Sequence, residues 1–189
     1  MSYKTIISSD ILKNNIDNKD FIIFDCRCDV KDSAYGIQAY TEGHIRNSIF
    51  VDIDSDLASE KTGSSGRHPL PDADMLSEKL SQWGLNSSKQ AVVYDDAGGA
   101  FAGRMWWILK WLGHANVAVL DGALGGWMAS GGKLTQDNTV FERSVFTPNA
   151  QDDMYVSIND VEDAQYKMNK LIIDARSKER YLGIKDPVD

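Results

Sequence analysis

Short apolar runs rich in β-branched residues recur along the chain. Most of them are continuous rather than alternating, and each ends in an aspartate. This pattern is typical of strands that are buried on both faces of a parallel sheet. The predicted strands are residues 21–25, 48–52, 91–95, 116–121 and 171–174.

Helices are predicted between these strands. Residues 72–83 carry apolar side chains at helical spacing and stop at Gly84. Residues 100–112 are apolar nearly all round, which is typical of a buried helix, so Trp106, Trp107 and Trp111 are expected in the core. The other predicted helices are residues 8–16, 36–42 and 122–130. Strands that alternate with helices predict an α/β sandwich.

The pattern of the first 27 residues starts again near Ser157, after an aperiodic segment. At a constant offset along the chain, the sequence Asp-x-Arg at residues 25–27 recurs at residues 174–176, each time after a capped helix and an apolar run. One helix and one strand cannot bury a core of their own. We therefore predict a complete first domain (1–132), a linker (133–155) and the truncated opening of a second, similar domain (156–189).

The charge balance and the hydropathy of the chain argue against binding to nucleic acid or to a membrane. The 189 residues include 20 Lys and Arg against 28 Asp and Glu, a net charge of −8. An acidic chain without a basic cluster is not expected to bind nucleic acid or an anionic membrane. The longest apolar stretch, 105–112, contains Lys110 and is too short to cross a bilayer. With no apolar region of a signal peptide near the N-terminus, the predicted location is cytoplasmic.

Two cysteines and three histidines offer little for metal chemistry. Cys26 and Cys28 are too close in sequence for a good disulfide, and the histidines show no ligand spacing, so two free thiols are expected, with no metal site and no cofactor. His44 is interpreted as a structural histidine. Cys26 follows a strand, where catalytic residues often lie, but no group is visibly placed to activate it; it remains a minor candidate nucleophile.

The segment after the third predicted strand has the form of an anion cradle. The strand ends at Asp95, a turn with Gly98 and Gly99 follows, and a helix begins. Backbone N–H groups at such a turn stabilise anions and lower the pKa of a thiol. The position of a nucleophile is occupied by Asp95, so the shape is expected without the chemistry, and no catalytic residue is predicted. A dinucleotide-binding loop is the alternative, but its glycines follow the order G-x-G-x-x-G, whereas the order here is G-G-x-x-x-G.

The two Asp-x-Arg sequences are interpreted as ion pairs that order the loops after their strands. Arg180 follows the second of them and precedes Tyr181 and Gly183. A fork-shaped guanidinium suits a carboxylate or a sulfonate-like anion, so Arg180 is a candidate substrate contact. A salt bridge, for instance to Asp174, is the alternative.

Seven motifs stand out in the first domain: FDCR (24–27), AYTEGHI (39–45), HPLP (68–71), VVYD (92–95), AGRMWW (102–107), LGH (112–114) and VLDGALGGW (119–127). Taken together, they resemble the N-terminal, non-catalytic domain of the tandem-domain rhodanese family, the thiosulfate and 3-mercaptopyruvate sulfurtransferases. Residues 171–189 resemble the opening of the family's C-terminal catalytic domain. The resemblance implies a rhodanese-like three-layer sandwich, with a central, mainly parallel sheet flanked by helices.

The resemblance also implies a reaction. In the family, a cysteine of the second domain takes sulfur from thiosulfate or 3-mercaptopyruvate as a persulfide and passes it to cyanide or a thiol. Arg180 matches the position of a substrate-binding arginine, Arg176 lies close by, and Asp95 matches the nucleophile's position in the silent domain. The cysteine loop is expected beyond Asp189, so this chain alone is predicted to be inactive, and its first domain is expected to pack on the C-terminal domain when that is present.

Two departures from the family pattern are Cys28, where tryptophan is frequent, and Arg46-Asn47, where Pro-Gly is usual. Two other functions stay open. One is a non-catalytic rhodanese-like module that binds or regulates. The other is a phosphatase on the related loop, which would also need a cysteine in place of Asp95.

Overall fold

The computed structural model describes residues 2–167 and 170–185, which fall into two compact units, Met1–Gln151 and Asp152–Asp189. The first unit contains a five-stranded sheet with the order β1-β6-β5-β2-β4. All four strand pairs in it are parallel. The strands are β1 (Ile6–Ile7), β2 (Phe21–Asp25), β4 (Ser48–Phe50), β5 (Gln90–Tyr94) and β6 (Val117–Leu120). The parallel sheet is thus confirmed, with small shifts at the strand ends.

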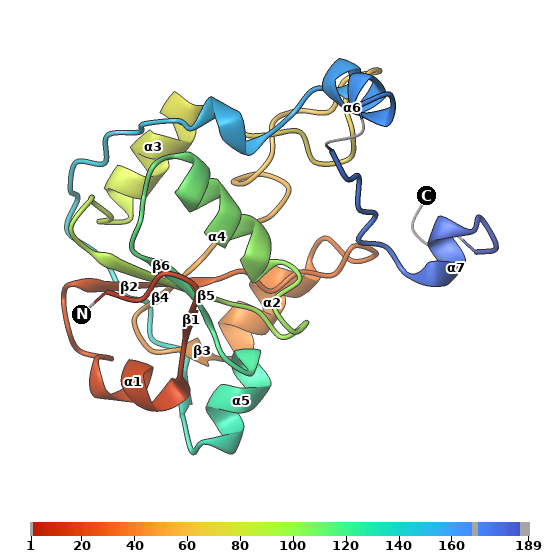
Figure 1. Ribbon diagram of the computed structural model, residues 1–189. Helices are drawn as coiled ribbons and strands as arrows, with labels where there is room; N and C mark the ends of the chain where they lie inside the picture. The colour runs from red at the N-terminus through yellow and green to blue at the C-terminus, as the bar shows by residue number, and fades with distance from the viewer. Residues whose placement is uncertain (1, 168–169, 186–189) are drawn as a thin grey trace. The chain divides into compact units, whose positions relative to one another are not determined.

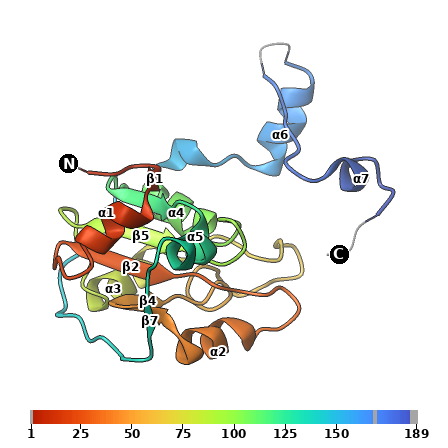
Figure 2. The same ribbon diagram turned by 90° about the horizontal axis from the view of Figure 1, so that it is seen from below.

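Helices cover both faces of this sheet, with α3 and α4 on one side and α1 and α5 on the other (Figure 1). Figure 2 looks from below, so that α1 and α5 lie nearer the viewer than the sheet. The helices are α1 (Ser9–Asn14), α2 (Tyr35–Glu42), α3 (Ala73–Gln82), α4 (Ala102–Trp111) and α5 (Ala123–Ala129). This is the predicted three-layer α/β sandwich.

The side chains of the central strands explain the layering. Most of them are apolar on both faces and buried, as in Ile22 and Ile23 of β2. On the α1/α5 face, Ile23 belongs to a core cluster with Leu12 and Trp127, whereas Phe24 on the opposite face contacts the ring of Trp83 after α3. Burial of each such side chain stabilises the fold by about 1.5–3 kcal/mol.

The prediction for the tryptophans of α4 was partly wrong. Trp111 is buried, but Trp106 and Trp107 are only half-buried. The helix packs on the sheet with one face, and the indole N–H of Trp106 donates to the carbonyls of Lys4 and Val117 at the edge of that contact.

The segment predicted as a linker (133–155) begins with β7 (Leu134–Thr135), which pairs antiparallel with β3 (His44–Ile45). The following residues, 136–151, which we call the strap, are bound to the rest of the first unit by backbone hydrogen bonds. Their bonds include Ser144 N–H to Ser81 O, Asn149 N–H to Leu112 O and Gln151 N–H to Trp111 O, at 2.9, 3.0 and 2.8 Å. Phe146 of the strap is buried. The domain boundaries given above remain predictions.

The second unit contains η1 (Asp152–Met154), α6 (Ile158–Gln165) and α7 (Lys178–Tyr181). Ser157 and Asp160 form a capping box at the start of α6. The strand predicted at residues 171–174 is wrong: these residues have no regular structure, and Leu171 is 83% exposed. A strand exists only when a neighbour takes its hydrogen bonds, and no described residue pairs with this run. No described helix is long and apolar enough to span a bilayer.

Candidate functional site

The residues that follow β2 and β5 share one edge of the sheet. The two strands pair in register, with Asp25 opposite Tyr94, so residues 26–28 and residues 95–96 leave the sheet together. In parallel α/β sheets, ligand sites form outside the carboxyl ends of the strands. This edge is therefore the expected place of a functional site.

Asp95 occupies the predicted anion cradle with its own carboxylate. One carboxylate oxygen accepts from the N–H groups of Ala97 and Gly99 at 3.0 and 2.8 Å. The other accepts from Phe101 and Ala102, both at 2.9 Å, at the start of α4. Asp95 is 0% exposed. The convergence of N–H groups predicted from the sequence is confirmed. The carboxylate of Asp95 occupies the four donors that a bound anion would need.

A buried ion pair lies beside the cradle. The Nε and Nη2 atoms of Arg27 donate to the carboxylate of Asp25 at 2.7–3.1 Å, and Nη2 also donates to the carbonyl of Gly43 at 2.8 Å. The hydroxyl of Tyr94 donates to the same carboxylate at 2.5 Å. Burial lowers the pKa of Arg27, but the hydrogen bond and charge of Asp25 outweigh it, so the pKa is raised. Arg27 is the structural ion-pair residue that the sequence predicted.

His44 is also structural, as predicted. It is buried, and its two ring nitrogens lie 2.8 and 3.2 Å from the carbonyls of Tyr40 and Asp137. Its ring stacks on that of Tyr40, with the centroids 3.8 Å apart. Both polar atoms are thus occupied in joining α2 to the strap.

The two cysteines are free thiols, but neither forms a thiolate readily. Burial, followed by the charges of Asp25 and Asp95, raises the pKa of Cys26 well above its usual value. Burial, followed by the charge of Asp54, raises the pKa of Cys28 to about 11. Nucleophilic cysteines need the opposite environment, a lowered pKa. Within the described ranges, no three His, Cys, Asp or Glu side chains converge on a point that could hold a metal ion.

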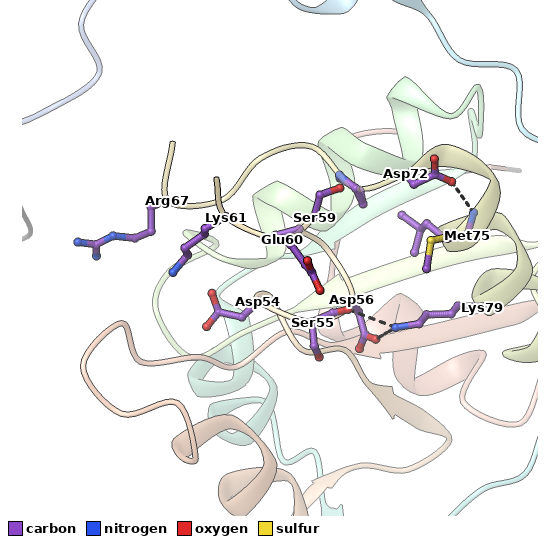
Figure 3. Close-up of a pocket in the computed structure, with 13 residues that line it drawn as sticks. Asp54, Ser55, Asp56, Ser59, Glu60, Lys61, Arg67, Asp72, Met75 and Lys79 are labelled. Atoms are coloured by element: carbon purple, nitrogen blue, oxygen red, sulfur yellow. Dashed lines mark hydrogen bonds and ion pairs between the residues drawn. The ribbon is translucent and has the colours of Figure 1, made fainter. Parts of the chain in front are cut away.

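A groove of about 640 Å³ lies between the segment 54–61, the end of the loop at Arg67 and α3 (Figure 3). Its lining combines charged residues of both signs with apolar residues. The residues are Asp54, Ser55, Asp56, Ala58, Ser59, Glu60, Lys61, Arg67, Pro71, Asp72, Met75, Leu76 and Lys79. Lys79 donates to Asp56 at 2.5 Å across it. A smaller pocket of about 270 Å³, lined by Cys28, His68 and Phe101 among others, shares Asp54, Lys61 and Arg67 with the groove.

The pair Asp54–His68 in this region was not found from the sequence. Nε2 of His68 lies 2.9 Å from Oδ1 of Asp54, and the His68 side chain is 25% exposed. An imidazole held by a carboxylate is an arrangement that can move protons in catalysis. No spacing rule links the two residues, because the path of the loop between them brings them together. The available signal was a histidine next to prolines at the end of a Gly/Ser-rich loop.

The predicted substrate-binding residues Arg176 and Arg180 lie in the second unit. Arg176 donates to the carboxylate of Asp174 at 2.6–3.0 Å, in the same fork that Arg27 forms with Asp25. This hydrogen bond lowers the pKa of Asp174, and the charge of Arg180 contributes in the same direction. Arg180 belongs to α7, which Ser177 caps by accepting the Arg180 N–H at 3.4 Å. The two arginines are thus four positions apart, one in the turn before α7 and one within it.

A five-stranded parallel sheet with this strand–loop–helix cradle defines a rhodanese fold. The sequence model of the Rhodanese-like domain matches residues 8–130, and the chain belongs to this family. It is 35% identical to a probable 3-mercaptopyruvate sulfurtransferase of Pseudomonas aeruginosa, over 100% of this chain and 67% of the relative. It is 33% identical to the putative thiosulfate sulfurtransferase SseB of Mycobacterium tuberculosis, over 84% of this chain and 56% of the relative.

Among solved structures, SseA from Escherichia coli, described as a 3-mercaptopyruvate sulfotransferase, superposes with a TM-score of 0.84 at 27% identity. The match covers 95% of this chain and 68% of that structure. The chain therefore spans between about half and two thirds of the length of these relatives.

Proposed function

We propose that this chain is the N-terminal part of a tandem-domain sulfurtransferase. Such an enzyme moves a sulfane sulfur from thiosulfate or 3-mercaptopyruvate to a thiophilic acceptor such as cyanide or a thiol. Membership of the rhodanese-like family supports the class, and the two donors are those in the names of its relatives. The single observation that supports a non-catalytic first domain is the carboxylate of Asp95, which fills the cradle where a nucleophile would lie.

The sulfur-carrying nucleophile is proposed to lie outside these 189 residues, in a second rhodanese domain that opens within residues 156–189. A carboxylate at position 95 forms no persulfide, and the raised pKa values of Cys26 and Cys28 leave few thiolates near neutral pH. In the reaction, a thiolate attacks the outer sulfur of thiosulfate and sulfite leaves. The acceptor then attacks the outer sulfur of the persulfide and restores the thiolate.

Two groups of this chain are assigned supporting roles in the proposal. Arg180, with Arg176 nearby, binds the anionic donor, since a guanidinium fork matches a carboxylate or a thiosulfate oxygen pair. With 3-mercaptopyruvate as donor, the thiolate attacks the donor's sulfur and the C–S bond breaks. The carbon of that bond leaves as the enolate of pyruvate and must gain a proton. The Asp54–His68 pair of the first unit has the chemistry to move a proton.

The test compares this chain with a chimera in which the remaining C-terminal part of the Pseudomonas aeruginosa relative is fused after residue 189. Thiocyanate release from thiosulfate and cyanide, and pyruvate release from 3-mercaptopyruvate, are measured for both. We expect no turnover by the chain alone, and turnover by the chimera that is lost when its added loop cysteine is replaced by serine. Turnover by the chain alone that disappears in Cys26→Ser or Cys28→Ser overturns the proposal.

A further inference from the structure

The loop 58–67 that forms one wall of the groove is tied at both ends to a single side chain of α4. Arg104 donates to the carbonyl of Leu57, before the loop, from Nη2 at 2.6 Å and from Nε at 3.1 Å. Nη2 also lies 3.1 Å from the carbonyl of His68 and 3.2 Å from that of Pro69, after the loop. One guanidinium thus bridges two chain segments that are separated by ten residues.

The acceptors of Arg104 are neutral carbonyls rather than a carboxylate. Burial lowers the pKa of Arg104, and the charge of Asp54 acts against that effect. Arginine presents several donors in a rigid plane, which lets one side chain hold several carbonyls at once; a lysine ammonium has no such fork. Holding these three carbonyls therefore requires the shape of the guanidinium and not only its positive charge.

The two halves of the Asp54–His68 pair are held in different ways. Asp54 lies in a local turn, where its N–H and that of Ser55 donate to the side chain of Asp52 at 2.8 Å. His68 lies at the far end of the loop, and its carbonyl is bound by Arg104. The position of the imidazole relative to Asp54 thus depends on the tie between the two loop ends.

The helix that carries Arg104 also holds the cradle. The N–H of Ala102, two residues earlier in α4, donates to Asp95 at 2.9 Å. The first turn of α4 therefore fixes both the loop after β5 and, through Arg104, the backbone of His68. A shift of this turn would move both features together.

We propose that Arg104 is a positioning residue that fixes the backbone of His68 and thereby sets the Asp54–His68 pair and the wall of the groove. Its importance for sulfur transfer rests on the function proposed above, but its structural effect does not. The test therefore uses readouts that need no turnover by the chain.

The experiment compares Arg104→Lys with Arg143→Lys in the full chain. Arg143 is the matched control because it forms a two-armed pair with Glu78 on the surface of α3, at 2.7 and 2.8 Å, and none of its described side-chain hydrogen bonds reaches the ends of loop 58–67. Hydrogen exchange is followed at Ser59, whose N–H donates to Pro69 at 3.3 Å, and in β5. Modification of histidine by diethyl pyrocarbonate reports on His68, because His44 and His114 are buried.

In Arg104→Lys, we expect exchange at Ser59 to rise about tenfold while β5 keeps its protection, because a local tie is lost rather than the global fold. The rate of carbethoxylation at His68 should rise roughly threefold, since an imidazole released from its carboxylate is more accessible. Arg143→Lys should change neither rate. Unchanged rates in Arg104→Lys, or equal increases at Ser59 and in β5, overturn the proposal.

A measurement on the wild-type chain keeps the proposal testable if Arg104→Lys does not fold. The Nε–H proton of Arg104 donates to Leu57 and should exchange with solvent more slowly than that of Arg143, by about tenfold or more. Equal exchange rates of the two protons would contradict the proposed clamp.

Discussion

Arg27 donates three side-chain hydrogen bonds to the carboxylate of Asp25, and both residues are buried at the carboxyl end of β2. Arg176 forms the same fork with Asp174, where both side chains are partly exposed to solvent. The fork needs only the local sequence Asp-x-Arg, so it forms in both units. The two pairs therefore differ in their contribution to the free energy of unfolding because one is buried and the other is exposed.

Replacing Arg27 by alanine should destabilise the first unit strongly. The substitution leaves Asp25 buried with Tyr94 as its remaining described side-chain donor, and breaking a buried ion pair typically costs about 3–5 kcal/mol. The free energy of unfolding from urea titration measures the loss. In the control variant, Arg176→Ala, the midpoint should not change, because water replaces the lost partner of an exposed carboxylate. Equal effects of the two variants would refute the distinction.

Replacing Asp95 by alanine should destabilise the loop 95–102 and with it the start of α4. Four N–H groups lose their acceptor, and unsatisfied buried donors cost about 1–3 kcal/mol each before water or structural adjustment compensates them. We expect a net loss of about 3 kcal/mol in urea titration, with partial recovery in sodium formate, which supplies a carboxylate to the empty cradle.

The control for this cradle experiment is Asp96→Asn, in which the neighbouring exposed carboxylate that Tyr35 contacts is replaced. Formate should not change its stability. If formate stabilises the wild type, Asp96→Asn and Asp95→Ala alike, the recovery is a general salt effect, and the cradle does not accept the anion.

The sequence was informative where local chemistry decides the structure. The apolar runs of β2 and β5 could be predicted because strands buried on both faces need them, and the cradle could be predicted because Asp95 is followed by glycines and a helix. Residues 171–174 have the same apolar character, but a strand also requires a partner, which a pattern of side chains does not reveal.

The contacts of the groove could not be predicted for a related reason. Asp54 and His68 are 14 residues apart, and Arg104 is 36 residues from His68 along the chain. The path of an irregular loop brings them together, and no periodicity describes such a path. For the same reason, the half-exposed position of Trp106 was missed: its surroundings include Lys4, far away in sequence.

The thiols should react slowly with alkylating reagents at neutral pH. Cys28 has a pKa raised to about 11, so the fraction of thiolate, and the rate of alkylation by iodoacetamide, should rise about tenfold per pH unit up to that value. Cys26 is buried and should react only after unfolding in urea. The variant Cys26→Ser should keep the full pH profile, whereas rapid alkylation near pH 7 in the native chain would contradict the raised pKa values.

His114 should make the first unit sensitive to acid. Its ring is buried against Phe146 of the strap, 5.9 Å between centroids, and neither ring nitrogen has a partner in hydrogen-bonding geometry among the described residues. Burial lowers its pKa from the ordinary value of 6.5 and outweighs the backbone of Asn116, which acts in the opposite direction. The unfolded chain therefore binds a proton more readily than the folded one. Above pH 6.5 His114 is neutral in both the folded and the unfolded chain and costs no stability. As the pH falls below 6.5, protons bind preferentially to the unfolded chain, and the free energy of unfolding decreases.

The variant His114→Phe tests this linkage, because it fills the site with an apolar ring that cannot be protonated. At pH 7.5 we expect little change in the free energy of unfolding, since an apolar ring of similar size replaces the imidazole in its buried site beside Phe146. At pH 5.5 the variant should be more stable than the wild type by up to about 1.4 kcal/mol, the integrated effect of a lowered pKa over one pH unit. In the control, His44→Phe, the carbonyls of Tyr40 and Asp137 lose the ring nitrogens that lie beside them, so a loss of about 1–3 kcal/mol is expected at pH 7.5. An acid sensitivity that persists unchanged in His114→Phe would assign it to another group.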